Sequence, residues 1–284
     1  MLPSFKSSDE TEAKVSGSYN VDGSRAGRLI INADDWGRDF ETTQRINECT
    51  DRDTVSSVSA MVFMTDSARA ADVAKEQGID AGLHLNLTTP FTSADCPRPV
   101  ASKQERIVGY LRSNRFARVI FNPLLMREFE YVVAAQIDEY RRLYGAEPVR
   151  IDGHHHMHLC ANVLFGRLLP SGTVVRRNFS FESGEKNLFN RSYRSFVDRM
   201  LARRHRLTDY FYSLPPIEPP ARLEKIFSLS RKFVVEVETH PVNAEEHRFL
   251  MGEELRRLVT NSRIATSFEI PGEECAKRSD ARRF

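Results

Sequence analysis

The sequence predicts an α/β protein, a single TIM-like parallel barrel of seven or eight strands. Three observations favour this class over a sandwich or a helical bundle. Short apolar runs alternate with helical patterns along most of the chain, as in proteins whose parallel strands are covered by helices. Acidic residues and histidines follow several of these runs, at the carboxyl ends of strands where α/β proteins carry function. The 284 residues can also bury a sizeable core in one domain.

The first predicted strand is the apolar run at residues 29–37, which ends in two neighbouring carboxylates. Adjacent residues of an extended strand point to opposite sides, so Asp34 and Asp35 can share one site only if the chain turns there. Gly37 permits such a turn. An alternative is that Asp34 caps a helix that begins near Arg38, with Asp35 as a solvated loop residue.

The later elements follow from apolar patterns with the periods of strands and helices. The further predicted strands are residues 55–63, 80–87, 149 through the histidine run at 154–158, 173–177, 209–213, 232–241 and 264–270. The predicted helices are residues 40–49, 65–77, 128–144, 159–169, 191–205, 223–228 and 245–259, with one more helical pattern before residue 128. Residues 88–103 are rich in Pro, Thr, Ser and Asp and predict a long loop that forms part of a substrate wall.

The ends of the chain differ from the middle. Residues 1–27 are polar and lack the apolar core of a secretory signal, so they predict a mobile extension. The predicted barrel domain covers residues 28–271, and residues 272–284 form a basic tail that we expect to be a solvated end.

Composition limits the partners. Lysine and arginine number 41 against 39 acidic residues, a balance that gives no argument for nucleic acid or an acidic membrane surface. Cys49, Cys96, Cys160 and Cys275 are scattered, which indicates a reducing, cytoplasmic setting. No apolar run approaches the ~20 residues of a membrane span. A small or neutral substrate fits best, and assembly into a homo-oligomer stays open.

Six of the eight histidines occupy three places: residue 84, the run at 154–158, and residue 240. In an extended chain His154, His156 and His158 share one face. One aspartate and two histidines make a reasonable open site for a catalytic metal. The alternatives are that His84 is a hydrogen-bonded core histidine, that the run is a solvated loop, and that His240 only caps or packs at the strand end.

Four blocks of sequence, taken in order, resemble the signatures of the YdjC-like carbohydrate deacetylases, a family with chitooligosaccharide deacetylases and a hopanoid-pathway member. The blocks are Asn32-Ala33-Asp34-Asp35-Trp36-Gly37, Gly82-Leu83-His84-Leu85-Asn86-Leu87-Thr88, Asp152-Gly153-His154-His155-His156-Met157-His158 and Glu238-Thr239-His240-Pro241. The resemblance runs from about Arg28 to Ile270. Trp36 replaces a more usual phenylalanine, and residues 175–179 match the family's arginine-containing segment only loosely.

The resemblance implies a distorted (β/α) barrel and the metal-dependent removal of an acetyl group from an N-acetylated sugar. By motif position, Asp35, His84 and His154 match the ligands of one divalent ion, zinc or magnesium, and Asp34 matches the catalytic base. His240 or a spare histidine would protonate the departing amine, and Asp152 would orient a ligand imidazole. The positions predicted to contact substrate are Trp36, Asn86, His156, His158 and Arg177.

Two other readings remain open. A glycosidase would use two carboxylates roughly 5–9.5 Å apart, but nothing beyond Asp34 or Asp35 nominates a pair, and the histidines would have no role. A sugar-binding barrel without activity would keep the same motifs, because motifs show capacity and not turnover.

Overall fold

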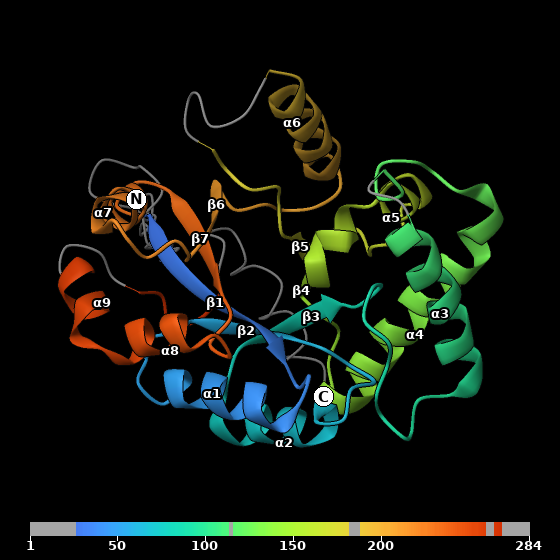
Figure 1. Ribbon diagram of the computed structural model, residues 1–284, viewed down its shortest axis with the longest axis horizontal. Coiled ribbons are helices and arrows are strands. Elements are labelled where there is room, and N and C mark those ends of the chain that lie inside the picture. The colour runs from blue at the N-terminus through green and yellow to red at the C-terminus, as the bar shows by residue number, and fades with distance from the viewer. Residues whose placement is uncertain (1–26, 114–115, 182–187, 260–263, 269–284) are drawn as a thin grey trace, which may run out of the picture.

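The computed structural model describes residues 27–113, 116–181, 188–259 and 264–268. Its centre is one parallel sheet of seven strands in the order β5-β4-β3-β2-β1-β7-β6, curled as in a barrel (Figure 1). The strands are β1 (Arg28–Trp36), β2 (Ser57–Ala60), β3 (Ala81–Leu85), β4 (Arg150–Gly153), β5 (Val174–Val175), β6 (Tyr210–Ser213) and β7 (Val234–Thr239). The predicted α/β barrel class is therefore confirmed.

The barrel is distorted because its two edge strands, β5 and β6, do not form a ladder in the described part of the chain. A single bridge joins Val174 to Arg206. Farther along, the Ser180 amide donates a hydrogen bond to the Phe211 carbonyl over 2.8 Å. Strand β5 has only two residues, which is too short to form a ladder with β6.

Nine α-helices are seen among the described residues. They are α1 (Phe40–Thr50), α2 (Ser67–Gln77), α3 (Arg98–Ser113), α4 (Met126–Tyr144), α5 (Ala161–Gly166), α6 (Leu188–Ala202), α7 (Pro220–Leu229), α8 (Ala244–Met251) and α9 (Glu253–Leu258). Two short 3₁₀ helices are η1 (Pro123–Leu125) and η2 (His154–Leu159). In Figure 1, α1 and α2 lie along one side of the sheet, α3 and α4 run side by side, and α6 stands apart from the strands. None of these helices is long and apolar enough to span a membrane.

Local signals explain several boundaries. The Asp39 side chain accepts a hydrogen bond from the Thr42 amide over 2.8 Å and so caps α1. Gly78 and Gly145 adopt left-handed φ values of 69° and 71°, and they end α2 and α4 directly after the predicted ranges 65–77 and 128–144. The apolar start of β1 is completely buried, as expected for a strand covered on both sides.

The most important difference from the prediction lies in the histidine run. Strand β4 ends at Gly153, and η2 replaces the expected strand, with left-handed φ values of 53° at His155 and 57° at His156. A Cβ atom on Gly153 would lie 2.9 Å from the His158 amide nitrogen, so the chain folds back over a position that only glycine fits. His154, His156 and His158 therefore do not share one face of a strand.

Three smaller differences concern boundaries. Helix α3 begins at Arg98, so the predicted loop at residues 88–103 is shorter. Gly252 divides the predicted helix at 245–259 into α8 and α9. Of the predicted strand at 264–270, Ile264 makes one isolated bridge to Leu29, and residues beyond 268 lie outside the described residues. The same holds for the predicted basic tail and, except for residue 27, the predicted N-terminal extension.

Candidate active site

Side chains that carry charge or can bind metal gather at the carboxyl ends of the strands. They are Asp34 and Asp35 on β1, His84 on β3, Asp152 on β4, His154 at the start of η2, Arg176 just after β5, and Glu236 and Glu238 on β7. All of them are buried. This is the edge at which parallel α/β sheets place their functional groups.

The two neighbouring carboxylates of β1 reach the same site because the strand is bulged. Its pairing with β2 shifts register between Ala33 and Trp36, and Asp35 has a left-handed φ of 72°. An extra residue of this kind turns a side chain that would otherwise point to the opposite face. Both Asp34 and Asp35 consequently approach His84. The helix cap nearby is Asp39, so the alternative roles for this pair do not apply.

Three donor atoms converge beside the bulge. Asp35 Oδ1 lies 2.9 Å from His154 Nδ1 and 3.4 Å from His84 Nε2. The oxygen is buried, yet it receives no hydrogen bond of acceptable geometry, while Asp35 Oδ2 accepts one from Arg38 over 2.7 Å. One carboxylate and two imidazoles are the donor set of a catalytic divalent metal site. These residues fit such an ion, and they are the three that the sequence nominated.

A carboxylate behind His84 fixes the direction of its ring. His84 Nδ1 lies 2.7 Å from Asp152 Oδ1, which leaves Nε2 to face the cluster and matches the predicted role of Asp152. Burial lowers the pKa of His84, but the charges of Asp34 and Asp152 outweigh it and raise the pKa to about 10. The local field thus favours positive charge at this point, whether a proton or a metal cation.

Arg176 is the cation at the centre of the cluster. Its guanidinium donates two hydrogen bonds to the Asp34 carboxylate, over 2.7 and 2.8 Å, and lies 3.0 Å from Asp152 Oδ2. Its Nε donates to Glu236 over 2.7 Å, and Nη1 lies 3.3 Å from Glu238. Burial alone would lower its pKa, but the surrounding carboxylates raise the pKa well above the ordinary arginine value. Arg176 is therefore a buried counter-ion, in the segment 175–179 that matches the family's arginine-containing segment only loosely.

The four carboxylates around Arg176 do not share its charge equally. Burial acts to raise the pKa of Asp34 and Asp152, but Arg176 and His84 lower it below the usual range. Burial raises the pKa of Glu236 and Glu238 more than Arg176 lowers it. The ionised form is therefore favoured at the two aspartates, and the protonated form becomes easier to reach at the two glutamates.

Two predicted substrate contacts, Trp36 and Asn86, are buried and make their hydrogen bonds within the protein. Trp36 is fully buried, and its Nε1 donates to the Ala70 carbonyl over 3.1 Å. The Asn86 side chain donates to the Thr89 carbonyl over 2.7 Å and accepts from the Thr88 and Thr89 amides over 3.2 and 2.9 Å. Trp36 thus packs in the core and Asn86 shapes the loop after β3, so neither position agrees with a substrate contact.

His158 is likewise enclosed. It is fully buried, and its Nε2 donates to the Arg176 carbonyl over 2.9 Å. Burial is the main cause that lowers the pKa of His158, to about 4, so the ring is neutral. Its contact supports the backbone of Arg176, and it is not among the described residues that line the cavity beside the cluster.

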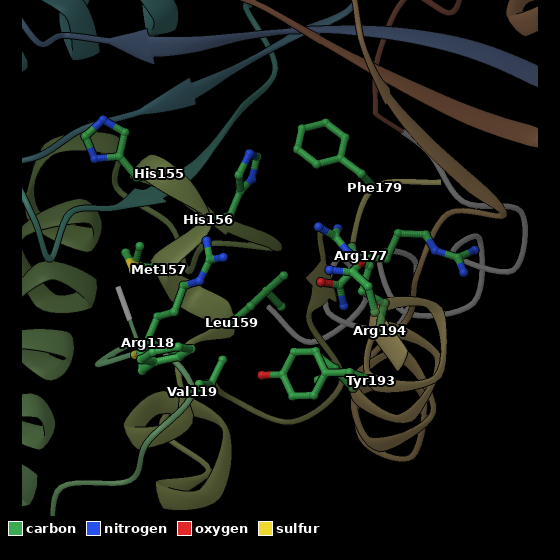
Figure 2. A pocket seen from close by; sticks show the side chains of 15 residues that line it. Arg118, Val119, His155, His156, Met157, Leu159, Arg177, Phe179, Tyr193 and Arg194 are labelled. Carbon is green, nitrogen blue, oxygen red and sulfur yellow. Dashed lines mark hydrogen bonds between the residues drawn. The ribbon is translucent and has the colours of Figure 1, made fainter. Parts of the chain in front are cut away.

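His156 and Arg177 do line a cavity, which has a volume of about 860 Å³ (Figure 2). His156 Nε2 lies 3.8 Å from Glu238 Oε1, and the ring packs edge-on against Phe179 with 4.7 Å between centroids. Arg177 Nη2 donates to Asp198 over 2.9 Å. No residue of the predicted loop at 88–103 lines this cavity.

Two further histidines that the sequence singled out, His155 and His240, lie near the cluster. His155 Nδ1 lies 2.9 Å from the Thr88 hydroxyl, and its ring is 4.0 Å from that of His154, between centroids. His240 follows β7, and its backbone amide donates to Glu246 Oε2 over 2.8 Å.

Several members of the site were not nominated from the sequence. Asn32 donates to Asp34 over 2.8 Å, and the Ser59 hydroxyl donates to Asp152 over 2.5 Å. Glu236 and Glu238 could have been predicted from the sequence, because two carboxylates at alternate positions of an otherwise apolar strand point to one buried face. Buried carboxylates need a nearby cation, so the sequence could also have predicted a buried arginine such as Arg176.

A profile of the YdjC-like protein family matches residues 28–261. The chain belongs to the YdjC-like family. As a YdjC-like protein it is similar to the carbohydrate deacetylases of Danio rerio, 27% identical over 163 residues, and Mus musculus, 30% identical over 148 residues. It is also similar to the chitooligosaccharide deacetylase of Yersinia enterocolitica, 28% identical over 138 residues.

These matches cover 55%, 48% and 48% of the chain and 51%, 44% and 52% of the respective relatives. The YdjC-like chain therefore spans about half the length of the curated relatives it matches. Among solved structures, it resembles a proposed cellobiose-phosphate cleavage protein from Enterococcus faecalis, with a TM-score of 0.59 and 18% identity. That match covers 86% of this chain and 97% of the other, and it supports the fold.

Proposed function

We propose that this YdjC-like protein is a metal-dependent amide hydrolase that removes the acetyl group from an N-acetylated sugar, releasing acetate and a free amine. The observation that carries the proposal is the convergence of Asp35, His84 and His154 around a buried carboxylate oxygen without a hydrogen bond. The names of the relatives, carbohydrate and chitooligosaccharide deacetylases, supply the substrate class.

Asp35, His84 and His154 would hold one divalent ion. When bound, such an ion lowers the pKa of water and polarises the acetyl carbonyl. Two imidazole donors favour zinc or another borderline metal over magnesium, which prefers oxygen.

Asp34 is the residue that we assign as the proton acceptor. Its Oδ2 lies 4.0 Å from His84 Nε2, so it borders the three donors without joining them. The bidentate contact with Arg176 fixes the orientation of Asp34 and keeps it ionised, as a group that accepts a proton from water must be.

The departing amine needs a proton, and His240 is our first candidate donor because it lies at the carboxyl end of β7 beside the cluster. His156 and Glu238 are the alternatives within reach of the cavity. The raised pKa of Glu238 makes it easier to protonate than a carboxyl in water. His156 and Arg177 line the cavity and are the proposed substrate contacts.

The activity is tested by measuring acetate release from N-acetylglucosamine oligosaccharides before and after exhaustive chelation, with reducing ends assayed in parallel. We expect acetate without new reducing ends, loss of activity on chelation, and recovery on adding zinc. New reducing ends without acetate would indicate a glycosidase, and neither product with retained sugar binding would indicate an inactive barrel.

The roles of the two aspartates are separated by their amide variants. Asp35→Asn should lower metal content and activity together, because the amide loses the charge that attracts the cation. Asp34→Asn should keep the metal and lose about 10²–10⁴ in rate, the usual effect of removing a positioned base. Elemental analysis measures the metal content of each variant, and acetate release measures its activity. If Asp34→Asn lost the metal and Asp35→Asn kept it, the assignment would be contradicted.

His155 provides a matched control for the ligands. His154→Ala should lose metal, whereas His155→Ala removes the contact with Thr88 and the ring contact with His154 but no metal-binding atom, so it should retain metal. Equal metal loss in both variants would contradict the ligand set.

A further inference from the structure

The cavity beside the cluster is larger than an acetamide group needs. It lies between η2, the segment near Val119 and helix α6 (Figure 2). Its volume of about 860 Å³ falls in the upper part of the range of roughly 300–1,000 Å³ for small-molecule sites. Most of its lining is apolar and includes Phe116, Val119, Met157, Leu159, Phe179 and Val197. Sugar hydroxyls need hydrogen-bonding groups, so this lining suits a different part of a substrate.

Among the described residues that line the cavity, the charged side chains apart from the histidines are three arginines, Arg118, Arg177 and Arg194. Arg177 is paired with Asp198, and Arg194 Nε donates to Asn190 Oδ1 over 2.7 Å. In the described part of the chain, the Arg118 guanidinium has no hydrogen bond or ion pair. Burial and the charge of Arg118 lower the pKa of Arg194. Two guanidinium groups that repel each other across an apolar cavity would be stabilised by an anion between them.

Apolar side chains are also exposed around this cavity. Twelve large apolar residues are exposed in the described part of the chain, and eight belong to the segment 116–124, to α5 or to α6. They are Phe116, Val119, Ile120, Phe121, Leu124, Phe165, Tyr193 and Phe196. Single exposed apolar residues are ordinary, but a concentration of them marks a contact surface for an apolar ligand.

The sequence around the cavity is strongly basic as well. Residues 112–127 and 188–206 together contain ten arginines and one aspartate, although the whole chain has a net charge of only +2. The remainder of the chain therefore carries an acidic excess of seven. An asymmetry of this size creates a positive field over one part of the surface and attracts anions to it.

We propose that the cavity binds the aglycone of the substrate, an apolar chain joined to the N-acetylated sugar through a phosphate group. The inference rests on the proposed function, since it names the substrate class of the same site. The apolar lining takes the chain, Arg118 and Arg194 take the phosphate, and the sugar extends past His155 and His156 toward the three metal-binding residues. A free oligosaccharide offers neither the apolar chain nor the anion.

Binding is measured by calorimetry on the full chain with n-dodecyl phosphate, kept below its micelle concentration, as the probe. Dodecyl β-glucoside supplies the chain without the anion, inorganic phosphate supplies the anion without the chain, and uridine diphosphate tests a nucleotide aglycone. We expect one dodecyl phosphate per protein and binding at least roughly tenfold weaker for each of the others, the loss expected for a missing charge-assisted contact or apolar chain.

Arg118→Glu is the informative variant, because its side chain is exposed and its reversal should not disturb folding. Arg127→Glu is the matched control, with the same change in net charge at an exposed residue outside the lining. Arg118→Glu should weaken dodecyl phosphate binding roughly tenfold or more, and Arg127→Glu should leave it unchanged. Equal binding of the glucoside, tighter binding of uridine diphosphate, or equal effects of the two variants would overturn the proposal.

The binding assay needs no turnover, which separates this inference from the proposed function. Acetate release without dodecyl phosphate binding would refute the aglycone site and leave the deacetylase standing. Dodecyl phosphate binding without acetate release from any N-acetylated sugar would support the ligand class and refute the deacetylase. If both hold, kcat/KM for N-acetylglucosaminyl dodecyl phosphate should exceed that for N-acetylglucosamine 1-phosphate by roughly tenfold.

Discussion

The buried guanidinium of Arg176 provides the sharpest test of how the site is held together. In Arg176→Met the side chain keeps much of its volume but loses its charge and every contact to Asp34, Asp152 and the two glutamates. Removing one member of a buried ion pair typically costs about 3–5 kcal/mol, because the other charge stays buried without compensation. For a domain of this size that corresponds to a decrease in melting temperature of roughly 6–20 °C.

Arg176→Met should also change how the free energy of unfolding depends on pH. In the native protein, Arg176 and His84 lower the pKa of Asp34 and Asp152, so their stabilisation is complete at neutral pH and is lost as pH falls through the acid range. Without Arg176, we expect burial, the largest influence on both carboxyl groups, to outweigh the remaining charge of His84 and to raise both pKa values above those of the unfolded chain. The variant should therefore become more stable, relative to its own value at pH 7, as pH falls toward 5.

Urea unfolding followed by circular dichroism between pH 5 and 8 measures both effects. Arg142→Met is the control, because Arg142 pairs with Glu139 on an exposed helix surface and its loss should change the unfolding free energy by no more than about 0.5 kcal/mol. If Arg176→Met unfolded at the wild-type urea concentration, with the wild-type pH trend, the counter-ion role would be refuted.

Four further outcomes follow from single groups. Metal binding at pH 7 should release at least about one proton per ion, since His84 has a pKa near 10 and must be neutral to bind; calorimetry in buffers of different ionisation enthalpy measures it. Burial lowers the pKa of His158 to about 4, so its contribution to stability is present above pH 6.5 and lost as pH falls toward 4; His158→Leu should flatten the fall in urea midpoint. Burial raises the pKa of Cys49 and Cys160 to about 12, and peptide mapping after iodoacetamide at pH 8 should find both unmodified in the native protein and modified in urea. Gly153→Ala should cost about 1–3 kcal/mol in urea unfolding, because the new Cβ meets a backbone nitrogen at 2.9 Å.

The strands and helices could be predicted where the sequence pattern reflects burial. Strand β1 and helices α2 and α4 appear close to their expected limits, because apolar periodicity and a terminal glycine report directly on the local chain. The three proposed metal-binding residues were nominated by their positions in the motifs that resemble the YdjC-like family, and each lies at the end of a strand or directly after one.

The histidine run shows where pattern reading fails. Alternating histidines predict a strand face, but the left-handed φ values at His155 and His156 turn the chain into η2. The turn depends on the close approach of Gly153 to His158, five residues later, and periodicity does not encode such contacts. The burial of Trp36 and Asn86 was missed for a similar reason, because their partners come from other segments.

Charge balance explains why residues so far apart in sequence form one site. Asp34, Asp35 and Asp152 have lowered pKa values, and their carboxylates lie against the guanidinium groups of Arg176 and Arg38. Buried charges persist only when they are compensated. In the metal-free protein the raised pKa of His84 supplies part of the missing positive charge as a proton. A divalent ion held as proposed by Asp35, His84 and His154 would add positive charge at the same point, so the carboxylates that need compensation would also favour a cation there.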